Sequence, residues 1–137
     1  MTRCEPPTVS VVIPAYNEEG NVQQLHEGLL RELAILGESF EIIYIDDGST
    51  DRTLANLSNL PHATIIVFSR NFGKSQALQA GFDVALGDYI ITLDGDLQDD
   101  PREIPNLMAR ARDGADLVCG WKQNRLDPTG KRFMGRR

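Results

Sequence analysis

Apolar residues along the chain follow two different spacings that alternate from one end to the other. Short, uninterrupted runs rich in valine and isoleucine are typical of strands buried on both faces of a sheet. Such runs predict strands at residues 8–14, 40–46, 63–69, 88–94 and 115–121. Between the runs, apolar residues recur every three or four positions, which predicts helices at residues 18–36, 51–60, 74–86 and 101–111.

Local signals indicate where two of these helices begin. Asn17 is suited to cap the first helix, because Glu18 and Glu19 would then occupy its first turn, where acidic residues are favourable. Asp100 is suited to cap the fourth helix, with Pro101 at the first helical position.

The alternation of strands and helices predicts an α/β fold with a Rossmann-like, mostly parallel sheet and helices on both faces. In such sheets, ligands bind beyond the carboxyl ends of the strands. Polar segments stand at these ends: AYNEE follows the first strand, DDGST the second, RNFGK the third and DGDLQDD the fourth. We therefore expect one site built from four loops at one edge of the sheet.

Composition limits the classes to which the protein can belong. Its 137 residues, 41% of them hydrophobic, suffice for one compact domain with a substantial core. The two cysteines, Cys4 and Cys119, are far apart and predict neither a disulfide framework nor a structural zinc site. No apolar stretch approaches the ~20 residues of a membrane-spanning helix, and the N-terminus lacks a signal-peptide core. We expect a soluble chain in a reducing cytoplasm.

The net charge of −6 is unevenly distributed. Residues 122–137 contain six basic residues and one acidic residue, so they carry +5 and residues 1–121 carry −11. An acidic body argues against a nucleic-acid binder, because phosphate contacts dominate that affinity. The chain thus divides into an acidic domain, residues 1–121, and a basic segment, residues 122–137. This segment is either a solvated end or an element that attracts a phosphate or an anionic membrane surface.

The acidic segment after the fourth strand is the first candidate for chemistry. In an extended backbone, Asp94, Asp96 and Gln98 point to the same side, as a divalent cation would require, and Gly95 lets a ligand approach the backbone. The spacing differs from that of an EF-hand, which has Gly at its sixth position and Glu at its twelfth. Two interpretations remain: a solvated loop, or a partly open Mg²⁺ or Mn²⁺ site completed by water and substrate phosphates.

Two adjacent carboxylates, Asp46 and Asp47, follow the second strand. Ser49 or Asp51 would cap the next helix, but a simple turn does not require two like charges side by side. A carboxylate at this position can accept hydrogen bonds from the N–H groups of a nucleobase, and the ring of Tyr16 either packs or stacks on that base. On this interpretation, ribose 5-phosphate, which has no base, would not sense the loss of Asp47.

Basic side chains are few at the same edge. Arg70 and Lys74 lie near the expected start of the third helix, where they are either surface charges or neutralise a diphosphate. His26 and His62 are isolated from every polar cluster, so we expect them to be structural or surface residues.

Four segments together resemble one family. VSVVIPAYNEE, IIYIDDGSTDRT, SRNFGKSQALQAGFDVALGDYIITLDGDLQDDP and DLVCGWKQNRLDP are similar to family 2 glycosyltransferases, within them to polyprenyl-phosphate glycosyltransferases related to dolichol-phosphate mannose synthase. The resemblance covers nearly all of residues 9–128. It implies a glycosyltransferase A fold and the transfer of a sugar, with inversion, from a UDP- or GDP-sugar. The implied acceptor is a polyprenyl phosphate at the cytoplasmic face of the membrane.

The resemblance also implies roles for individual residues. The nucleotide pocket would be lined by Pro14, Tyr16 and Glu18, with Asp46 and Asp47 holding the base and Asp94 lying against the nucleotide. Lys74 is expected to join this nucleotide-binding set through the diphosphate. Asp96 and Gln98 would bind the Mg²⁺ or Mn²⁺ that bridges the diphosphate, so Asp96 is also expected to be catalytic.

Acceptor-side chemistry is expected from the basic segment. Lys122 stands where family members have the arginine of a Gly-x-Arg motif near the acceptor phosphate, and it lacks the bidentate fork of arginine. We expect Lys122 and Arg125 to be catalytic on this side.

Two other kinds of protein compete with this interpretation. Family members continue well past the length of this chain, which is therefore expected to hold the donor site and only the start of the acceptor region. A non-catalytic nucleotide-binding fragment is one alternative. A receiver domain is the other, because it also clusters Asp residues and Mg²⁺ on a parallel sheet. Its acidic pair, however, follows the first strand, where this chain has PAYNEE.

Overall fold

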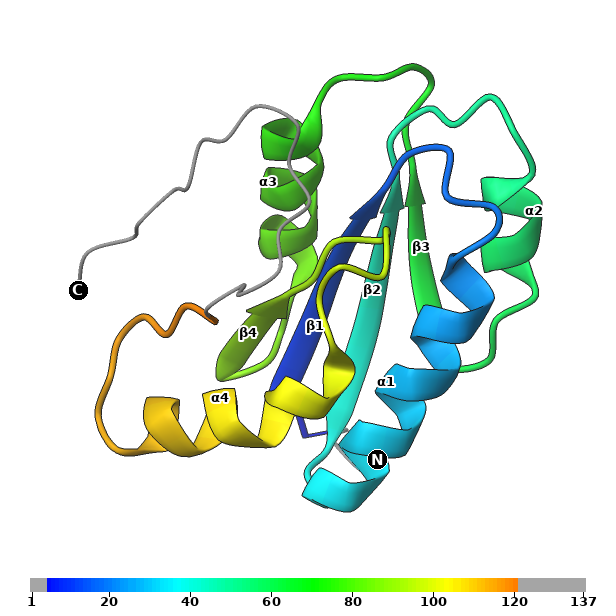
Figure 1. The fold of residues 1–137 in the computed structure, drawn as a ribbon. Coiled ribbons are helices and arrows are strands. Elements are labelled where there is room, and N and C mark those ends of the chain that lie inside the picture. Colours follow the sequence, from blue (N-terminus) through cyan, green and yellow to red (C-terminus); the bar gives the residue numbers. More distant parts are fainter. Residues whose placement is uncertain (1–4, 121–137) are drawn as a thin grey trace, which may run out of the picture.

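A computed structural model of the protein describes residues 5–120 (Figure 1). The strands are β1 (Val9–Ala15), β2 (Phe40–Asp46), β3 (Ala63–Val67) and β4 (Tyr89–Thr92). The helices are α1 (Val22–Leu36), α2 (Thr53–Ser58), α3 (Lys74–Val84) and α4 (Ile104–Arg112), with a 3-10 turn, η1 (Pro101–Glu103), before α4. The strands form one parallel sheet in the order β3-β2-β1-β4, which confirms the predicted α/β fold.

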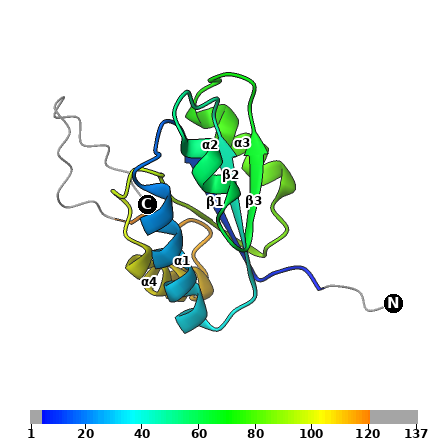
Figure 2. The same cartoon turned by 90° about the vertical axis from the view of Figure 1, so that its right-hand side faces the viewer.

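The order of the strands explains why helices cover both faces of the sheet. The chain steps from β1 to β2 to β3, and then crosses back to place β4 on the other side of β1. Crossovers between parallel strands are right-handed, so reversing the direction of the step moves the connecting helix to the opposite face. Accordingly α1 and α4 lie on one side of the strands and α3 on the other (Figure 2).

Alternation along the strands divides the core into two clusters. In β1, Val9, Val11 and Ile13 belong to the larger cluster, whereas Val12 belongs to the smaller one. The larger cluster is completed mainly by Leu25, Leu29 and Leu33 of α1, Leu57 of α2, and Ile104 and Met108 of α4. The smaller cluster joins Val12, Ile43 and Ile45 to Ala77 of α3.

Gly81 allows helix α3 to pack closely on the sheet. A Cβ atom at this position would lie 2.3 Å from Val12 Cγ1 and 3.0 Å from Ile45 Cδ1. The backbone of α3 therefore packs directly on the side chains of β1 and β2. This contact sets how closely the Gly81 turn of α3 approaches the sheet.

His26 has the structural role that the sequence left as one of two possibilities. It is buried between α1 and β2, with Nε2 2.6 Å from the Pro61 carbonyl oxygen and Nδ1 2.9 Å from the Tyr44 hydroxyl. Because a carbonyl only accepts, Nε2 carries the proton and Nδ1 accepts from Tyr44. Burial lowers the pKa of His26 below its usual value, which favours this neutral form.

Two predictions about the elements are wrong. Asn17 does not cap α1, which begins at Val22; instead Asn17 is left-handed, with φ of 51°, and its Oδ1 accepts the Thr50 N–H at 2.8 Å. Residues 115–120 form no strand, and Leu117 is 82% exposed. An apolar run becomes a strand only when a neighbouring strand and a covering layer bury it.

The predicted cap before the fourth helix is confirmed. Asp100 caps the turn that precedes α4, since its Oδ1 accepts the Arg102 N–H at 2.9 Å, and Pro101 stands first in that turn, as expected. Within residues 5–120 no helix combines the length and the apolar character needed to cross a bilayer.

Candidate functional site

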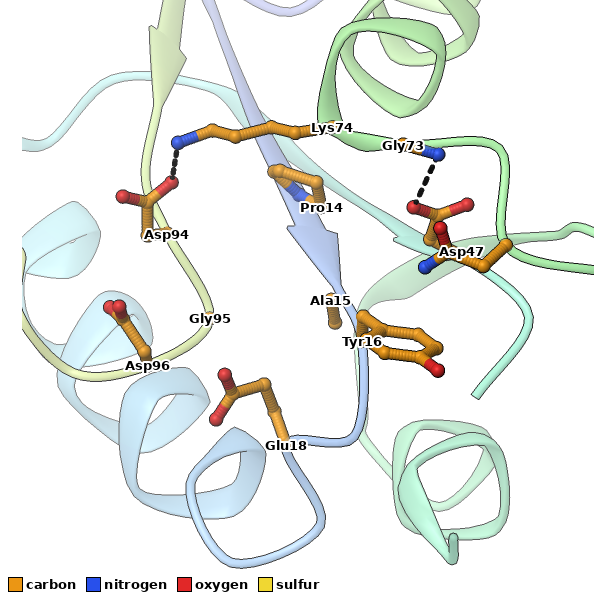
Figure 3. A pocket seen from close by; sticks show the side chains of 11 residues that line it. Pro14, Ala15, Tyr16, Glu18, Asp47, Gly73, Lys74, Asp94, Gly95 and Asp96 are labelled. Atoms are coloured by element: carbon orange, nitrogen blue, oxygen red, sulfur yellow. Dashed lines mark hydrogen bonds and ion pairs between the residues drawn. The ribbon is translucent and has the colours of Figure 1, made fainter. Parts of the chain in front are cut away.

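One pocket of about 400 Å³ lies where the carboxyl ends of β1, β2 and β4 meet the start of α3 (Figure 3). It lies beside the β1–β4 pair, where the strand order reverses: the chain leaves β1 toward β2 and returns from β3 to β4 on the other side of β1. This is the position at which open α/β sheets bind ligands. Of the residues predicted for the site, those that line the pocket are Pro14, Tyr16, Glu18, Asp47, Lys74, Asp94, Gly95 and Asp96.

Three lining residues were missed from the sequence: Ala15, Asn71 and Gly73. Ala15 lies between two residues that were predicted, and its small side chain gave no chemical signal. Asn71 and Gly73 belong to the RNFGK segment, which was recognised only for its charges.

The pocket has two chemically different sides. In Figure 3, Glu18, Asp94 and Asp96 lie on one side, while Tyr16 and Asp47 lie on the other. Tyr16 is 44% exposed, so part of its ring is accessible. A flat, partly apolar ligand group would suit the Tyr16 side, and cations or phosphates bridged by cations would suit the acidic side.

Side chains from the loop after β2 and from the start of α2 hold the loop after β1 in place. The Asn17 N–H donates to Ser49 Oγ at 3.0 Å, and the Glu18 N–H donates to Thr53 Oγ1 at 2.8 Å. The Asp51 carboxylate in turn accepts the Thr53 N–H at 2.9 Å. Because the backbone of residues 17–18 is fixed in this way, Tyr16 and Glu18 are presented to the pocket from a defined position.

Asp47 is the central connection of the site. Its Oδ1 accepts the Phe72 N–H at 2.8 Å and its Oδ2 accepts the Gly73 N–H at 3.1 Å, while its own N–H donates to the Ala15 carbonyl at 2.9 Å. Asp47 is only 4% exposed. It therefore joins the end of β1 to the segment between β3 and α3.

Gly48 allows this connection by its lack of a side chain. Its φ is +69°, and a Cβ atom there would lie 2.2 Å from the carbonyl carbon of Arg70. The two loops can meet at this distance only because residue 48 is glycine.

Asp46 does not line the pocket, although its neighbour Asp47 does. The Asp46 side chain is buried and its Oδ1 accepts the Ser49 N–H at 3.3 Å, a contact that stabilises the turn after β2. Neighbouring residues at the end of a strand point to opposite sides, so only one of this pair reaches the ligand side.

Lys74 reaches across the pocket mouth and forms an ion pair with the Asp94 carboxylate (Figure 3). The backbone N–H of Asp94 donates to Asp99 Oδ2 at 2.8 Å, which fixes the start of the acidic loop. Arg70 does not line the pocket; its guanidinium lies over the Phe72 ring, 4.6 Å from the ring centroid.

The acidic loop is not extended, contrary to the premise on which the metal ligands were predicted. β4 ends at Thr92, residues 95–96 form a turn, and Leu97 is left-handed with φ of 63°. Gln98 consequently lines a different cavity, of about 530 Å³, next to α1. Asp96 remains at the first pocket and accepts the Gln98 N–H at 3.1 Å.

The acidic side offers the type of ligand that a divalent cation needs, but too few side chains to hold it alone. Glu18, Asp94 and Asp96 offer carboxylate oxygens, the ligands that Mg²⁺ and Mn²⁺ prefer. In the part of the chain that the structure describes, no group of three or more His, Cys, Asp or Glu side chains is arranged to hold a metal ion. A cation here would need additional oxygens from water or from a phosphate ligand.

The predicted acceptor-side residues, Lys122 and Arg125, lie outside the described residues.

Comparison with known proteins identifies curated relatives of the chain. It is 44% identical over 124 residues to the undecaprenyl-phosphate 4-deoxy-4-formamido-L-arabinose transferase of Proteus mirabilis, a match that covers 87% of this chain and 38% of the relative. The protein of the same name from Shewanella sediminis is 41% identical over 131 residues, covering 91% of this chain and 39% of the relative. The chain thus spans about two fifths of the length of these relatives.

Solved structures place the fold among glycosyltransferases. Glucosyl-3-phosphoglycerate synthase from Mycobacterium tuberculosis, in complex with UDP, aligns with a TM-score of 0.66 and 26% identity, covering 79% of this chain and 41% of the synthase. The same enzyme with Mn²⁺, UDP and glucosyl-3-phosphoglycerate aligns with a TM-score of 0.64 and 25% identity, covering 77% and 39%. The predicted glycosyltransferase A fold is thereby confirmed, as an N-terminal part of it.

The model of the family described as "Glycosyl transferase family 2" matches residues 10–137, which is nearly the whole chain. This match excludes the receiver domain that the acidic clusters also suggested. The family resemblance of the four sequence motifs is confirmed, and the chain belongs to glycosyl transferase family 2.

Proposed function

We propose that the chain is the donor-binding part of a glycosyltransferase that moves a sugar from a UDP- or GDP-sugar to a polyprenyl phosphate. The observation that carries the proposal is the two-sided pocket, which offers a ring and a carboxylate on one side and acidic oxygens beside Lys74 on the other. Relatives named as undecaprenyl-phosphate transferases support the acceptor class. A neighbour in complex with Mn²⁺ and UDP supports the donor class.

The nucleotide would bind across the two sides. Its base would stack on Tyr16 and donate to the Asp47 carboxylate, each of whose oxygens keeps a lone pair after accepting one backbone N–H. Its diphosphate would lie next to Lys74, whose ammonium group offsets part of the negative charge. Pro14 and Glu18 would complete the walls of the pocket.

We assign the Mg²⁺ or Mn²⁺ to Asp96, with Glu18 and Asp94 beside it. The Gln98 side chain is a weaker candidate, since it lines a different cavity. The bound cation would supply positive charge against the departing nucleoside diphosphate. Lys74 would act on the same leaving group from the other side of Asp94.

The transfer itself would be a single displacement with inversion. An oxygen of the acceptor phosphate forms a bond to the anomeric carbon, while the bond from that carbon to the diphosphate breaks and the nucleoside diphosphate leaves with the electron pair. A phosphate monoester has its second pKa at about 6, so the acceptor is ionised at neutral pH and no general base is required. The protein would act where this acceptor is embedded, at the cytoplasmic face of the membrane.

Calorimetric titration with UDP and GDP tests the donor site. We expect binding in the presence of Mn²⁺ or Mg²⁺, weaker binding with a chelator, and a weakened metal-dependent component in Asp96→Asn. The control is Asp83→Asn, an exposed aspartate of α3 outside the pocket, which should bind as the native protein does. Equal affinity with and without the chelator would contradict the role of the metal, and absence of nucleotide binding would contradict the proposed function.

Turnover distinguishes an enzyme from a non-catalytic nucleotide-binding fragment. In the complete protein, we expect sugar transfer to a polyprenyl phosphate, and we expect replacement of both Lys122 and Arg125 by Ala to raise the KM for the acceptor far more than the KM for the sugar nucleotide. An unchanged acceptor KM would remove these two residues from the acceptor site.

A further inference from the structure

Asp47 holds a loop as well as lining the pocket. Its two carboxylate oxygens accept the N–H groups of Phe72 and Gly73, two consecutive residues between β3 and α3. The next residue in the chain is Lys74, the first residue of α3, whose ammonium group pairs with Asp94 across the pocket. Only one peptide unit therefore separates the anchored Gly73 N–H from the backbone of the lysine.

The chemistry of this contact requires a carboxylate. Two adjacent N–H donors need two acceptors, and an ionised Asp offers an acceptor at each oxygen. An Asn at position 47 would offer one acceptor and one NH₂ group, so one of the two backbone donors would face another donor. Because Asp47 is 4% exposed, water has little access to replace the lost acceptor.

The loop is also held from the side of Gly48. The backbone of Arg70 lies so close that a Cβ atom at position 48 would come within 2.2 Å of its carbonyl carbon. Phe68 N–H, at the start of the same loop, donates to the Asp46 carbonyl at 2.9 Å. The loop is thus fixed at both of its ends by the segment 46–48, and the carboxylate of Asp47 fixes the end that leads into α3.

From these contacts we infer that Asp47 is a positioning residue for Lys74: by anchoring the Phe72 and Gly73 N–H groups, it places the lysine at the diphosphate side of the pocket. Recognition of the base and placement of the Lys74 ammonium group then both depend on the Asp47 carboxylate. This inference rests on the proposed function for the identity of the ligand, but the anchoring itself does not. It changes the expectation from the sequence that a ligand without a base would not sense Asp47.

Amide hydrogen exchange of the complete protein tests the anchoring without any ligand. In Asp47→Asn, the N–H groups of Phe72 and Gly73 should exchange faster than in the native protein. The matched control is Asp51→Asn, which makes the same substitution at the carboxylate that accepts the Thr53 N–H at the start of α2 and should leave residues 72 and 73 unchanged. Unchanged exchange at both residues in Asp47→Asn would overturn the inference.

Titration with ribose 5-diphosphate in the presence of Mn²⁺ tests the effect on Lys74, because this probe has a diphosphate and no base. We expect Asp47→Asn and Lys74→Ala each to weaken its binding about tenfold, the factor that corresponds to one lost charge-assisted hydrogen bond. In the double variant, we expect no loss beyond that of Lys74→Ala, because Asp47 acts through the lysine.

The other outcomes of these experiments distinguish failure of the positioning role of Asp47 from failure of the proposed donor-binding function. Undiminished binding to Asp47→Asn, or losses that add in full in the double variant, would overturn the positioning role. Lys74 is well exposed, so Lys74→Ala should fold, and undiminished binding to that variant would also overturn it. Failure of the native protein to bind UDP or GDP would contradict the proposed function, whereas the exchange measurement would still decide whether Asp47 anchors the loop.

Discussion

Replacement of Gly48 by alanine should damage both the stability and the site of the protein. The residue has φ of +69°, and the added Cβ atom would lie 2.2 Å from the Arg70 carbonyl carbon and 2.5 Å from the Asn71 nitrogen. Both contacts are with backbone atoms, so no side-chain rotation relieves them. The loop that contains Phe72 and Gly73 must move away from Asp47.

The magnitude follows from two separate effects. A left-handed backbone costs a non-glycine residue about 1–2 kcal/mol, and overpacking typically costs about 1–3 kcal/mol. We therefore expect Gly48→Ala to lower the free energy of unfolding by about 2–5 kcal/mol. Gly37 provides the matched control, since its φ is +73° and a Cβ atom there would meet nothing within 4 Å. Gly37→Ala should lose only the first contribution, about 1–2 kcal/mol.

Urea unfolding followed by circular dichroism measures both variants, and calorimetry measures their affinity for UDP. Gly48→Ala should lose more stability than Gly37→Ala and should also bind UDP more weakly, whereas Gly37→Ala should bind UDP as the native protein does. If both variants lose the same stability and keep the same affinity, the contact between Gly48 and the Arg70 backbone does not support the site.

Two further predictions concern the core. Gly81→Ala should lower the free energy of unfolding by about 1–3 kcal/mol, because its Cβ atom would lie 2.3 Å from Val12 Cγ1. The control is Gly20→Ala, whose Cβ atom would meet nothing within 4 Å. Equal effects of the two substitutions in urea unfolding would contradict the close packing of α3. Burial lowers the pKa of His26 from 6.5, so below pH 6.5 the unfolded chain takes up a proton that the folded protein does not bind. Stability should then fall as the pH is lowered, by up to about 1.4 kcal/mol per pH unit. His26→Gln should lack this contribution, and an identical pH dependence in both proteins would refute it.

The sequence predicted the parallel sheet and the helices well because their signals are local. Runs of valine and isoleucine mark β1 and β2, and the spacing of leucine marks α1. The errors arise where distant contacts decide the structure. Asn17 has the composition of a helix cap, but its amide binds Thr50, thirty-three residues away, and α1 starts later. The run at 115–120 has apolar residues without a layer that buries Leu117.

The candidate site was predicted in outline for the same reason. Strand ends in a parallel sheet converge, so polar residues after strands were correctly grouped around one pocket. What the sequence did not indicate is the direction of individual side chains. Nothing near Leu97 signals its left-handed backbone, which turns Gln98 toward α1. Likewise, the sequence gives no sign that Asp47 already accepts two backbone N–H groups.

The shortness of β4, which has four residues, affects which part of the sheet unfolds locally first. Within the described residues, β4 pairs only with β1, whereas β1 pairs along both of its edges. A short strand held on one side opens at a lower free energy than the centre of a sheet. Asp94 and Asp96 follow β4, while Tyr16 and Asp47 follow β1 and β2. Within the described residues, the segment with Asp94 and Asp96 should therefore open at a lower free energy than the segments with Tyr16, Glu18 and Asp47, and a ligand that contacts both would oppose this opening by tying β4 to the rest of the sheet.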